Sequence, residues 1–143
     1  MSFTKTIQLA FFMSLLSPAL VLAELPGVRV VVSGLSPATG TVEVSLFEST
    51  ESFMIEPYLQ QSGTAGEDGS FETEFVGLTD GEYAVVVVHD ANDNGKLDNG
   101  FLGFGGEGYG FSNNAQSWFG WPDFEDAMIM VDQPAILVEI DLD

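Results

Sequence analysis

The sequence has 143 residues, with 22 Asp or Glu against three Lys or Arg, so its formal net charge is −19. This acidity excludes nucleic acid as a partner, because phosphate backbones would be repelled. The chain has no cysteine and a single histidine, His89, so it offers no disulfide, no thiol nucleophile and too few ligands for zinc. We therefore expect a protein that is not an enzyme.

Residues 1–23 are typical of a secretory signal peptide. Lys5 precedes an apolar run over residues 7–16, and the segment closes on Val-Leu-Ala at 21–23. A retained membrane anchor is the weaker alternative, because the apolar run is too short to span a bilayer. We expect a periplasmic or secreted bacterial protein whose mature chain, 24–143, is one monomeric domain without a membrane anchor. Its two cations and 22 acids give a formal charge of 2 − 22 = −20.

The mature chain predicts an all-β sandwich of about seven strands. Short runs of β-branched and aromatic residues alternate with Gly, Pro, Asp and Ser, which is typical of sandwich strands and turns. The run Val85–Val88 is apolar on both faces, so its strand is expected at the centre. Residues 128–131 are expected to pair with the last strand, and 52–59 form either a helical turn or a loop. The expected strands are 28–32, 41–48, 71–76, 83–89, 128–131 and 136–142.

Residues 90–98 read Asp-Ala-Asn-Asp-Asn-Gly-Lys-Leu-Asp and predict a calcium site at the exit of the central strand. Oxygen-bearing side chains stand at positions 1, 3, 5 and 9 and glycine at position 6, as in an EF-hand loop. The predicted ligands are the side chains of Asp90, Asn92, Asn94 and Asp98 and the backbone carbonyl of Lys96. The alternative is a plain two-residue hairpin turn at Asn94-Gly95, which would not require the other acceptors.

One ligand of an EF-hand loop is missing from this pattern. An EF-hand has a bidentate Glu at position 12, where this chain has Phe101. Glu107 is the nearest downstream acid, and Asp123, Glu125 and Asp126 are more distant candidates. Only two of the loop ligands have a formal charge, so we expect weak affinity, roughly 10⁻⁴ to 10⁻³ M, as in extracellular modules.

Residues 100–122 are rich in glycine and aromatic residues and are long for a connection inside a compact domain. Most of the aromatic side chains are expected to fold inward as a lid on one end of the sandwich, because burying them is favourable. The alternative is that Trp118 and Trp121 stay partly exposed as a stacking platform for a sugar or peptide.

Two blocks of the sequence carry a resemblance to a known family. The first runs from Gly81 to Asp98, and the second contains Gly-Tyr-Gly-Phe-Ser-Asn-Asn-Ala at 108–115 and Pro-Asp-Phe-Glu-Asp-Ala at 122–127. Over essentially the whole mature chain, the sequence resembles the exported bacterial proteins called domain of unknown function 2141. The resemblance implies a small immunoglobulin-like or transthyretin-like β-sandwich, and it implies no activity. Family members tend to have Pro and Lys just before Glu107, where this chain has two glycines.

Three functions are compatible with these observations. The first is an exported, non-enzymatic, calcium-binding β-sandwich that recognises an unknown extracytoplasmic ligand or protein. The second is a calcium-dependent enzyme for an extracellular glycan or peptide, with Glu107 and residues 123–126 supplying acid and base. The third is a carrier of an apolar small molecule held beneath the aromatic stretch. The sequence favours the first.

Overall fold

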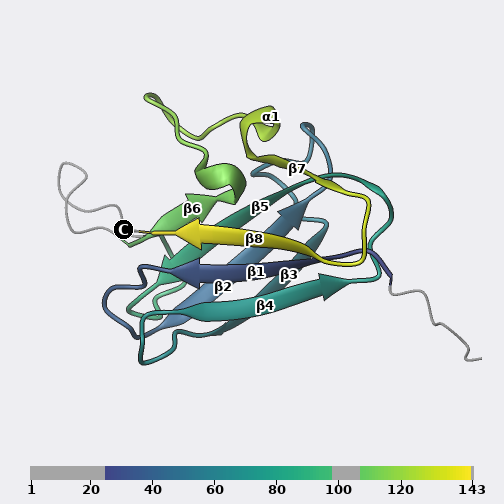
Figure 1. The fold of residues 1–143 in the computed structure, drawn as a ribbon. Coiled ribbons are helices and arrows are strands. Elements are labelled where there is room, and N and C mark those ends of the chain that lie inside the picture. The colour runs from purple at the N-terminus through teal and green to yellow at the C-terminus, as the bar shows by residue number, and fades with distance from the viewer. Residues whose placement is uncertain (1–24, 98–106, 143) are drawn as a thin grey trace, which may run out of the picture.

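The computed structural model describes residues 25–97 and 107–142, which form two facing β-sheets (Figure 1). The smaller sheet has the order β4 (Phe71–Val76), β1 (Gly27–Ser33) and β8 (Ile136–Asp141). The larger has the order β3 (Leu59–Thr64), β2 (Thr41–Phe47), β5 (Gly81–Asp90) and β6 (Tyr109–Phe111), with β7 (Met128–Val131) also paired to β5. Two short helical turns, η1 (Ser112–Asn114) and α1 (Phe124–Ala127), follow β6. The predicted all-β sandwich is confirmed, with eight strands in the described residues.

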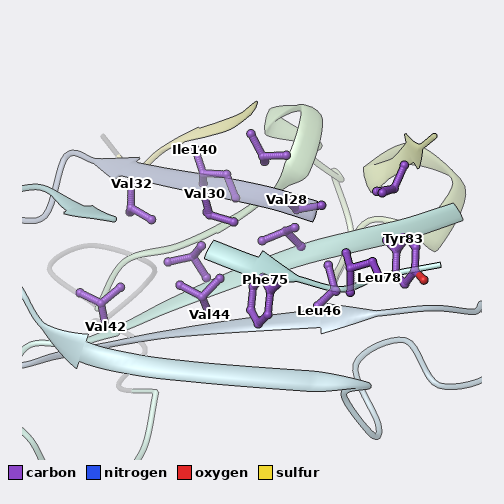
Figure 2. Packing of buried hydrophobic residues seen from close by; sticks show 14 of the residues in the cluster. Val28, Val30, Val32, Val42, Val44, Leu46, Phe75, Leu78, Tyr83 and Ile140 are labelled. Atoms are coloured by element: carbon purple, nitrogen blue, oxygen red, sulfur yellow. The ribbon is translucent and has the colours of Figure 1, made fainter. Parts of the chain in front are cut away.

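The main core lies between the two sheets and is built from alternate residues of the strands (Figure 2). Every second residue of β1 and β2 is apolar and fully buried, as period-two alternation requires of a strand that buries one face. Each such side chain contributes about 1.5–3 kcal/mol by leaving water. The fully buried side chains of this cluster include Val28, Val30, Val32, Val42, Val44, Leu46, Val85 and Val87.

β5 is central and buried on both faces, as its apolar run predicts. Val85 and Val87 belong to the main core, whereas Ala84 and Val86 belong to a second cluster on the outer face of the larger sheet. Its other buried members are Phe47, Phe111, Phe124 and Ala127. The second cluster therefore packs α1 onto the outer face of the larger sheet, against β5 and β6.

The expected pairing between residues 128–131 and the last strand is wrong. β7 pairs antiparallel with β5, Tyr83 opposite Ile129, whereas β8 runs parallel to β1 in the other sheet, Val30 opposite Val138. The chain thus crosses from one sheet to the other between the two strands. The residue pattern of both strands indicates one buried and one exposed face. Such a pattern specifies which face is buried but not which strand lies alongside.

Two strands were not predicted from the sequence. β3 consists of Leu-Gln-Gln-Ser-Gly-Thr and is almost wholly exposed, so no apolar alternation marks it. It lies at the edge of the larger sheet, where the Gln61 side chain donates to the Glu74 carbonyl of β4 at 2.9 Å and links the sheets. β6 lies within residues 100–122, the stretch rich in glycine and aromatic residues. Residues 51–55 form a turn, closed by the Phe53 N–H bond to the Ser49 carbonyl at 3.0 Å.

Candidate metal centre

The exit of β5 is held firmly against the start of β2. Asp90 is the last residue of β5 and pairs with Thr41. His89 is buried, and its Nε2 donates to the Thr39 carbonyl at 2.7 Å, so its ring has a structural role at the strand end. The hydroxyl of Thr41 donates to the Asp93 carboxylate at 2.7 Å. The segment that starts at Asp90 is therefore fixed to the most buried strand of the fold.

Gly40 makes this close approach possible. Its φ is +82°, and a Cβ at this position would lie 2.1 Å from the Asp90 carbonyl oxygen and 2.7 Å from the Ala91 Cα. A side chain would therefore collide with the backbone that begins the loop. Only glycine combines this dihedral angle with this proximity.

The Asp90 carboxylate accepts hydrogen bonds from successive backbone amides of its own loop. The Asn94 N–H donates to Oδ1 at 3.1 Å and the Gly95 N–H donates to Oδ2 at 2.7 Å. Desolvation would raise the pKa of the Asp90 carboxyl, but the N–H groups of Gly95, Asn94 and Asp93, with Glu107, outweigh it and hold the pKa below its ordinary value. The carboxylate is thus kept ionised.

The two asparagines of the loop repeat this arrangement. The Asn92 Oδ1 accepts from the Asn94 N–H at 3.0 Å, and the Asn94 Oδ1 accepts from the Lys96 N–H at 2.8 Å. Side-chain oxygens from positions 1, 3 and 5 of the predicted calcium loop are therefore all folded back against the loop backbone. Asp98, at position 9, lies outside the described residues.

The plain Asn94-Gly95 hairpin turn is not what the structure contains. A two-residue turn of that type needs positive φ at both central residues. Gly95 has φ +73°, but the other positive φ in the loop, +56°, belongs to Asp93 and not to Asn94. In addition, the next described strand begins only at Tyr109, so no tight hairpin joins β5 to its successor.

Glu107 lies beside the loop. Its Oε1 accepts a long hydrogen bond from the Asn92 N–H at 3.4 Å, and its side chain contributes to lowering the pKa of the Asp90 carboxyl. The approach depends on the pairing of β5 and β6, which continues in the His89 N–H bond to the Gly108 carbonyl at 2.9 Å. Asp90 follows His89 and Glu107 precedes Gly108, so this pairing brings the two acidic residues to the same end of the sheet.

The three more distant acids lie at the other end of the larger sheet. The hydroxyl of Thr50, just beyond β2, donates to the Glu125 Oε1 at 2.8 Å. Asp123 immediately precedes α1, and Asp126 lies within it. This helical turn leads into β7, where Met128 pairs with Ala84. Ala84 is six residues from Asp90 along β5, or about 20 Å at 3.3 Å per residue.

A hollow of about 580 Å³ adjoins the loop on the outer face of the larger sheet. Its carboxylates are those of Glu43, Asp90 and Asp93, and Lys96 is its one cation. The surplus of negative charge attracts cations. Within residues 25–97 and 107–142, no three His, Cys, Asp or Glu side chains form a ready metal-binding group. Two of the loop's acceptors are Asn amides, so they do not enter that count.

The aromatic side chains of residues 107–122 divide between core and surface. Phe111 is buried in the second cluster, whereas Trp118 and Phe119 are 97% and 95% exposed. Trp121 is 44% exposed and meets Tyr109 edge to face, with ring centroids 4.8 Å apart. The expectation that most of these rings fold inward is therefore wrong for the tip of the segment. Phe101 and Phe104 lie outside the described residues.

Comparison with known proteins identifies one family. The model of a family described as "Uncharacterized protein conserved in bacteria (DUF2141)" matches residues 30–138. No curated protein and no solved structure matches the chain. In the described part of the chain, no helix is long and apolar enough to cross a membrane.

Proposed function

This chain belongs to the uncharacterized bacterial family DUF2141, and we propose that it is an exported, calcium-stabilised β-sandwich that acts as a binding module. Calcium would be held by the side chains of Asp90, Asn92, Asn94 and Asp98, the Lys96 carbonyl and Glu107. All of these ligands are oxygens, which suit calcium rather than a transition metal.

The observation that carries the proposal is the approach of Glu107 to the loop that begins at Asp90, where its Oε1 lies 3.4 Å from the Asn92 nitrogen. The carboxylates of Asp90 and Glu107, brought to the same loop, repel each other unless a proton or a cation lies between them. The backbone amides around Asp90 favour its ionised form. A divalent cation neutralises both groups at once. Asn92 and Asn94 offer further oxygens on the same segment.

The position of the loop determines what calcium would do for the fold. The loop continues directly from β5, which is buried on both faces, so ordering the loop couples to the stability of the sandwich. Calcium at about 100 times its dissociation constant would add about 2.7 kcal/mol to the free energy of unfolding. With no cysteine in the sequence, the protein has no disulfide to supply the same stabilisation.

Thermal unfolding of two matched variants tests the proposal. Asp90→Asn and Asp93→Asn each remove one charge from the same loop, but the Asp93 carboxylate accepts from the Thr41 hydroxyl on the β2 side. Millimolar calcium should raise the melting temperature of the wild type and of Asp93→Asn by several degrees relative to chelator. Asp90→Asn should lose this shift. Identical melting curves for the wild type with calcium and with chelator would overturn the proposal.

The geometry does not support the alternative of a calcium-dependent enzyme with Glu107 and residues 123–126 as acid and base. Paired catalytic carboxylates of glycosidases lie about 5–10 Å apart. Glu107 adjoins the start of the loop, whereas Glu125 bonds to Thr50 at the opposite end of the sheet. The two groups therefore cannot flank one scissile bond.

A further inference from the structure

A second cavity, of about 260 Å³, lies where β6, η1 and the end of β8 meet the segment 115–122. Every residue that lines it belongs to the described part of the chain. The lining residues fall into two groups. Polar side chains come from Asn114, Gln116, Ser117 and Asp141, and ring or aliphatic surface comes from Tyr109, Phe111, Pro122 and Leu142. This volume lies just below the range of about 300–1,000 Å³ that is usual for small-molecule sites.

The polar side of the cavity is formed around two asparagines with fixed conformations. Asn113 and Asn114 both have left-handed backbone conformations, with φ of +60° and +48°, which residues other than glycine rarely adopt. Asn113 is held by donating to the Met128 carbonyl at 2.8 Å. Asn114 uses its Oδ1 to accept from the Asp141 N–H at 3.3 Å, so the amide is oriented at the cavity wall. The Gln116 amide has no hydrogen-bond partner among the described residues.

Two aromatic residues line the same cavity, and a third packs on both of them. Phe111 and Tyr109 line it, and Trp121 packs on both, with ring centroids 5.8 and 4.8 Å away. Trp118 and Phe119 project from the tip of the segment 115–122. The half-exposed rings of Tyr109 and Trp121 therefore offer flat surface near the polar residues Asn114 and Gln116.

The charge of the lining residues excludes anionic ligands from this cavity. The sequence contains only three cations, and one of the described pair, Arg29, is engaged with Glu72 on the smaller sheet. Lys96 lines the other hollow. No cation lines this cavity, and the acidic residue Asp141 is among its lining residues. Phosphate, sulfate and uronic acid groups would therefore be repelled.

We propose that this cavity binds a neutral sugar ring. A pyranose has faces of C–H groups, which are attracted to the negative faces of aromatic rings, and a rim of hydroxyls, which bond to amides and carboxylates. The cavity pairs these two kinds of surface. A purely apolar ligand would cover the Gln116 amide without offering it a hydrogen bond, which is costly. The inference specifies the ligand of the proposed binding module and does not depend on calcium.

Intrinsic fluorescence gives a direct test, because Trp118 and Trp121 are the only tryptophans in the chain. The probes are oligosaccharides of glucose, xylose and N-acetylglucosamine, with a galacturonic acid oligosaccharide as the acidic comparison. At least one neutral probe should change the emission saturably, and the acidic one should not. Trp118→Phe should retain part of the change, since Trp121 remains as reporter.

Matched variants separate binding from folding. Tyr109→Ala and Tyr58→Ala remove rings that are each 45% exposed, but Tyr58 packs on Tyr83, away from the cavity. Tyr109→Ala and Gln116→Ala should weaken sugar binding at least tenfold, while Tyr58→Ala and the exposed Gln133→Ala should change it less than twofold. No saturable response to any neutral probe, equal weakening by Tyr58→Ala, or binding of extended peptides alone would overturn the inference.

These outcomes are distinguishable from failure of the calcium proposal. Sugar titrations in calcium and in chelator report on the cavity, whereas the calcium-dependent melting shift without sugar reports on the loop. Saturable sugar binding in chelator, with no calcium shift, would retain this inference and reject the calcium site. The converse result would retain the calcium site and reject the sugar.

Discussion

The Glu107 Oε1 lies 3.4 Å from the backbone nitrogen of Asn92, although the two residues are separated by fifteen positions in the sequence. The contact brings an acid from the entry to β6 to the loop that leaves β5. Glu107 therefore lies beside the loop whose sequence pattern lacks the final acidic ligand of an EF-hand.

Replacing Glu107 should weaken calcium binding without unfolding the protein. Glu107→Gln keeps the size of the side chain and the bond to the Asn92 N–H but removes the charge. Since ligand charge sets affinity in such loops, we expect at least about tenfold weaker binding, or roughly 1.4 kcal/mol. Calorimetric titration measures it, with Glu139→Gln on the exposed face of β8 as control. Equal affinities in the two variants would remove Glu107 from the site.

Two glycine substitutions should differ sharply in their effect on stability. Gly40→Ala places a methyl group 2.1 Å from the Asp90 carbonyl, whereas Gly95→Ala meets no atom within 4 Å, and both positions have positive φ. Both should lose about 1–2 kcal/mol to backbone strain. Gly40→Ala should lose about 1–3 kcal/mol more through the collision, and its calcium affinity should fall as the loop shifts. Urea denaturation that ranks the two equally would contradict this account of Gly40.

The sequence predicted the parts of the fold that depend on local pattern. Alternation at Val42, Val44 and Leu46 identified β2, and the doubly apolar run identified the centrality of β5. The Asx residues of the loop were also recognisable, because their hydrogen bonds reach only two to five residues ahead. The pairing of β7 with β5 was not recognisable from the sequence, because the choice of partner strand is decided by long-range packing rather than by the strand's own residues.

The site's more distant parts needed the tertiary structure. Glu107 is placed by the β5–β6 pairing, and β6 has only three residues. A local signal for β6 was present in the alternation of Tyr109, Gly110 and Phe111. A Cβ at Gly110 would lie 2.5 Å from Ile140, so glycine lets β6 approach β8 while Tyr109 and Phe111 lie on the opposite face of the larger sheet. The cavity has no sequence signal of its own, since its walls come from β6, η1 and β8.

Asn113 should be required for its backbone conformation as well as its side chain. Asn113→Ala should lose about 1–2 kcal/mol from the left-handed conformation and about 0.5–1.5 kcal/mol for each bond to the Asp126 and Met128 carbonyls. Asn113→Gly should recover part of the conformational loss but none of the hydrogen bonding. Chemical denaturation should therefore rank wild type above Asn113→Gly and that variant above Asn113→Ala. An alanine variant as stable as the wild type would contradict this assignment.

The Asp68 carboxyl should make stability depend on pH in the acid range. The side chain and the N–H of Ser70 hold the pKa of Asp68 below its ordinary value, with contacts of 2.7 and 3.1 Å. A folded pKa below the unfolded one stabilises the protein above the unfolded value, about 3.9, and that stabilisation is lost as pH falls through the lower folded value.

Ser70→Ala should therefore raise the pKa of Asp68, seen by carboxyl NMR titration, and should lower stability above pH 4 more than below it. Ser62→Ala, on the exposed β3, is the control. A pKa of Asp68 that does not move in Ser70→Ala would show that the hydroxyl contributes nothing.

Amide NMR during a calcium titration tests the central claim most directly. The N–H groups of Asn94, Gly95 and Lys96 are bonded to the side chains that would bind the ion. Their resonances should shift saturably, with a dissociation constant of roughly 10⁻⁴ to 10⁻³ M. The shifts should disappear in Asp90→Asn and persist in Asp93→Asn. Resonances of these three amides that do not respond to millimolar calcium, while the protein remains folded, would contradict the calcium-stabilised sandwich.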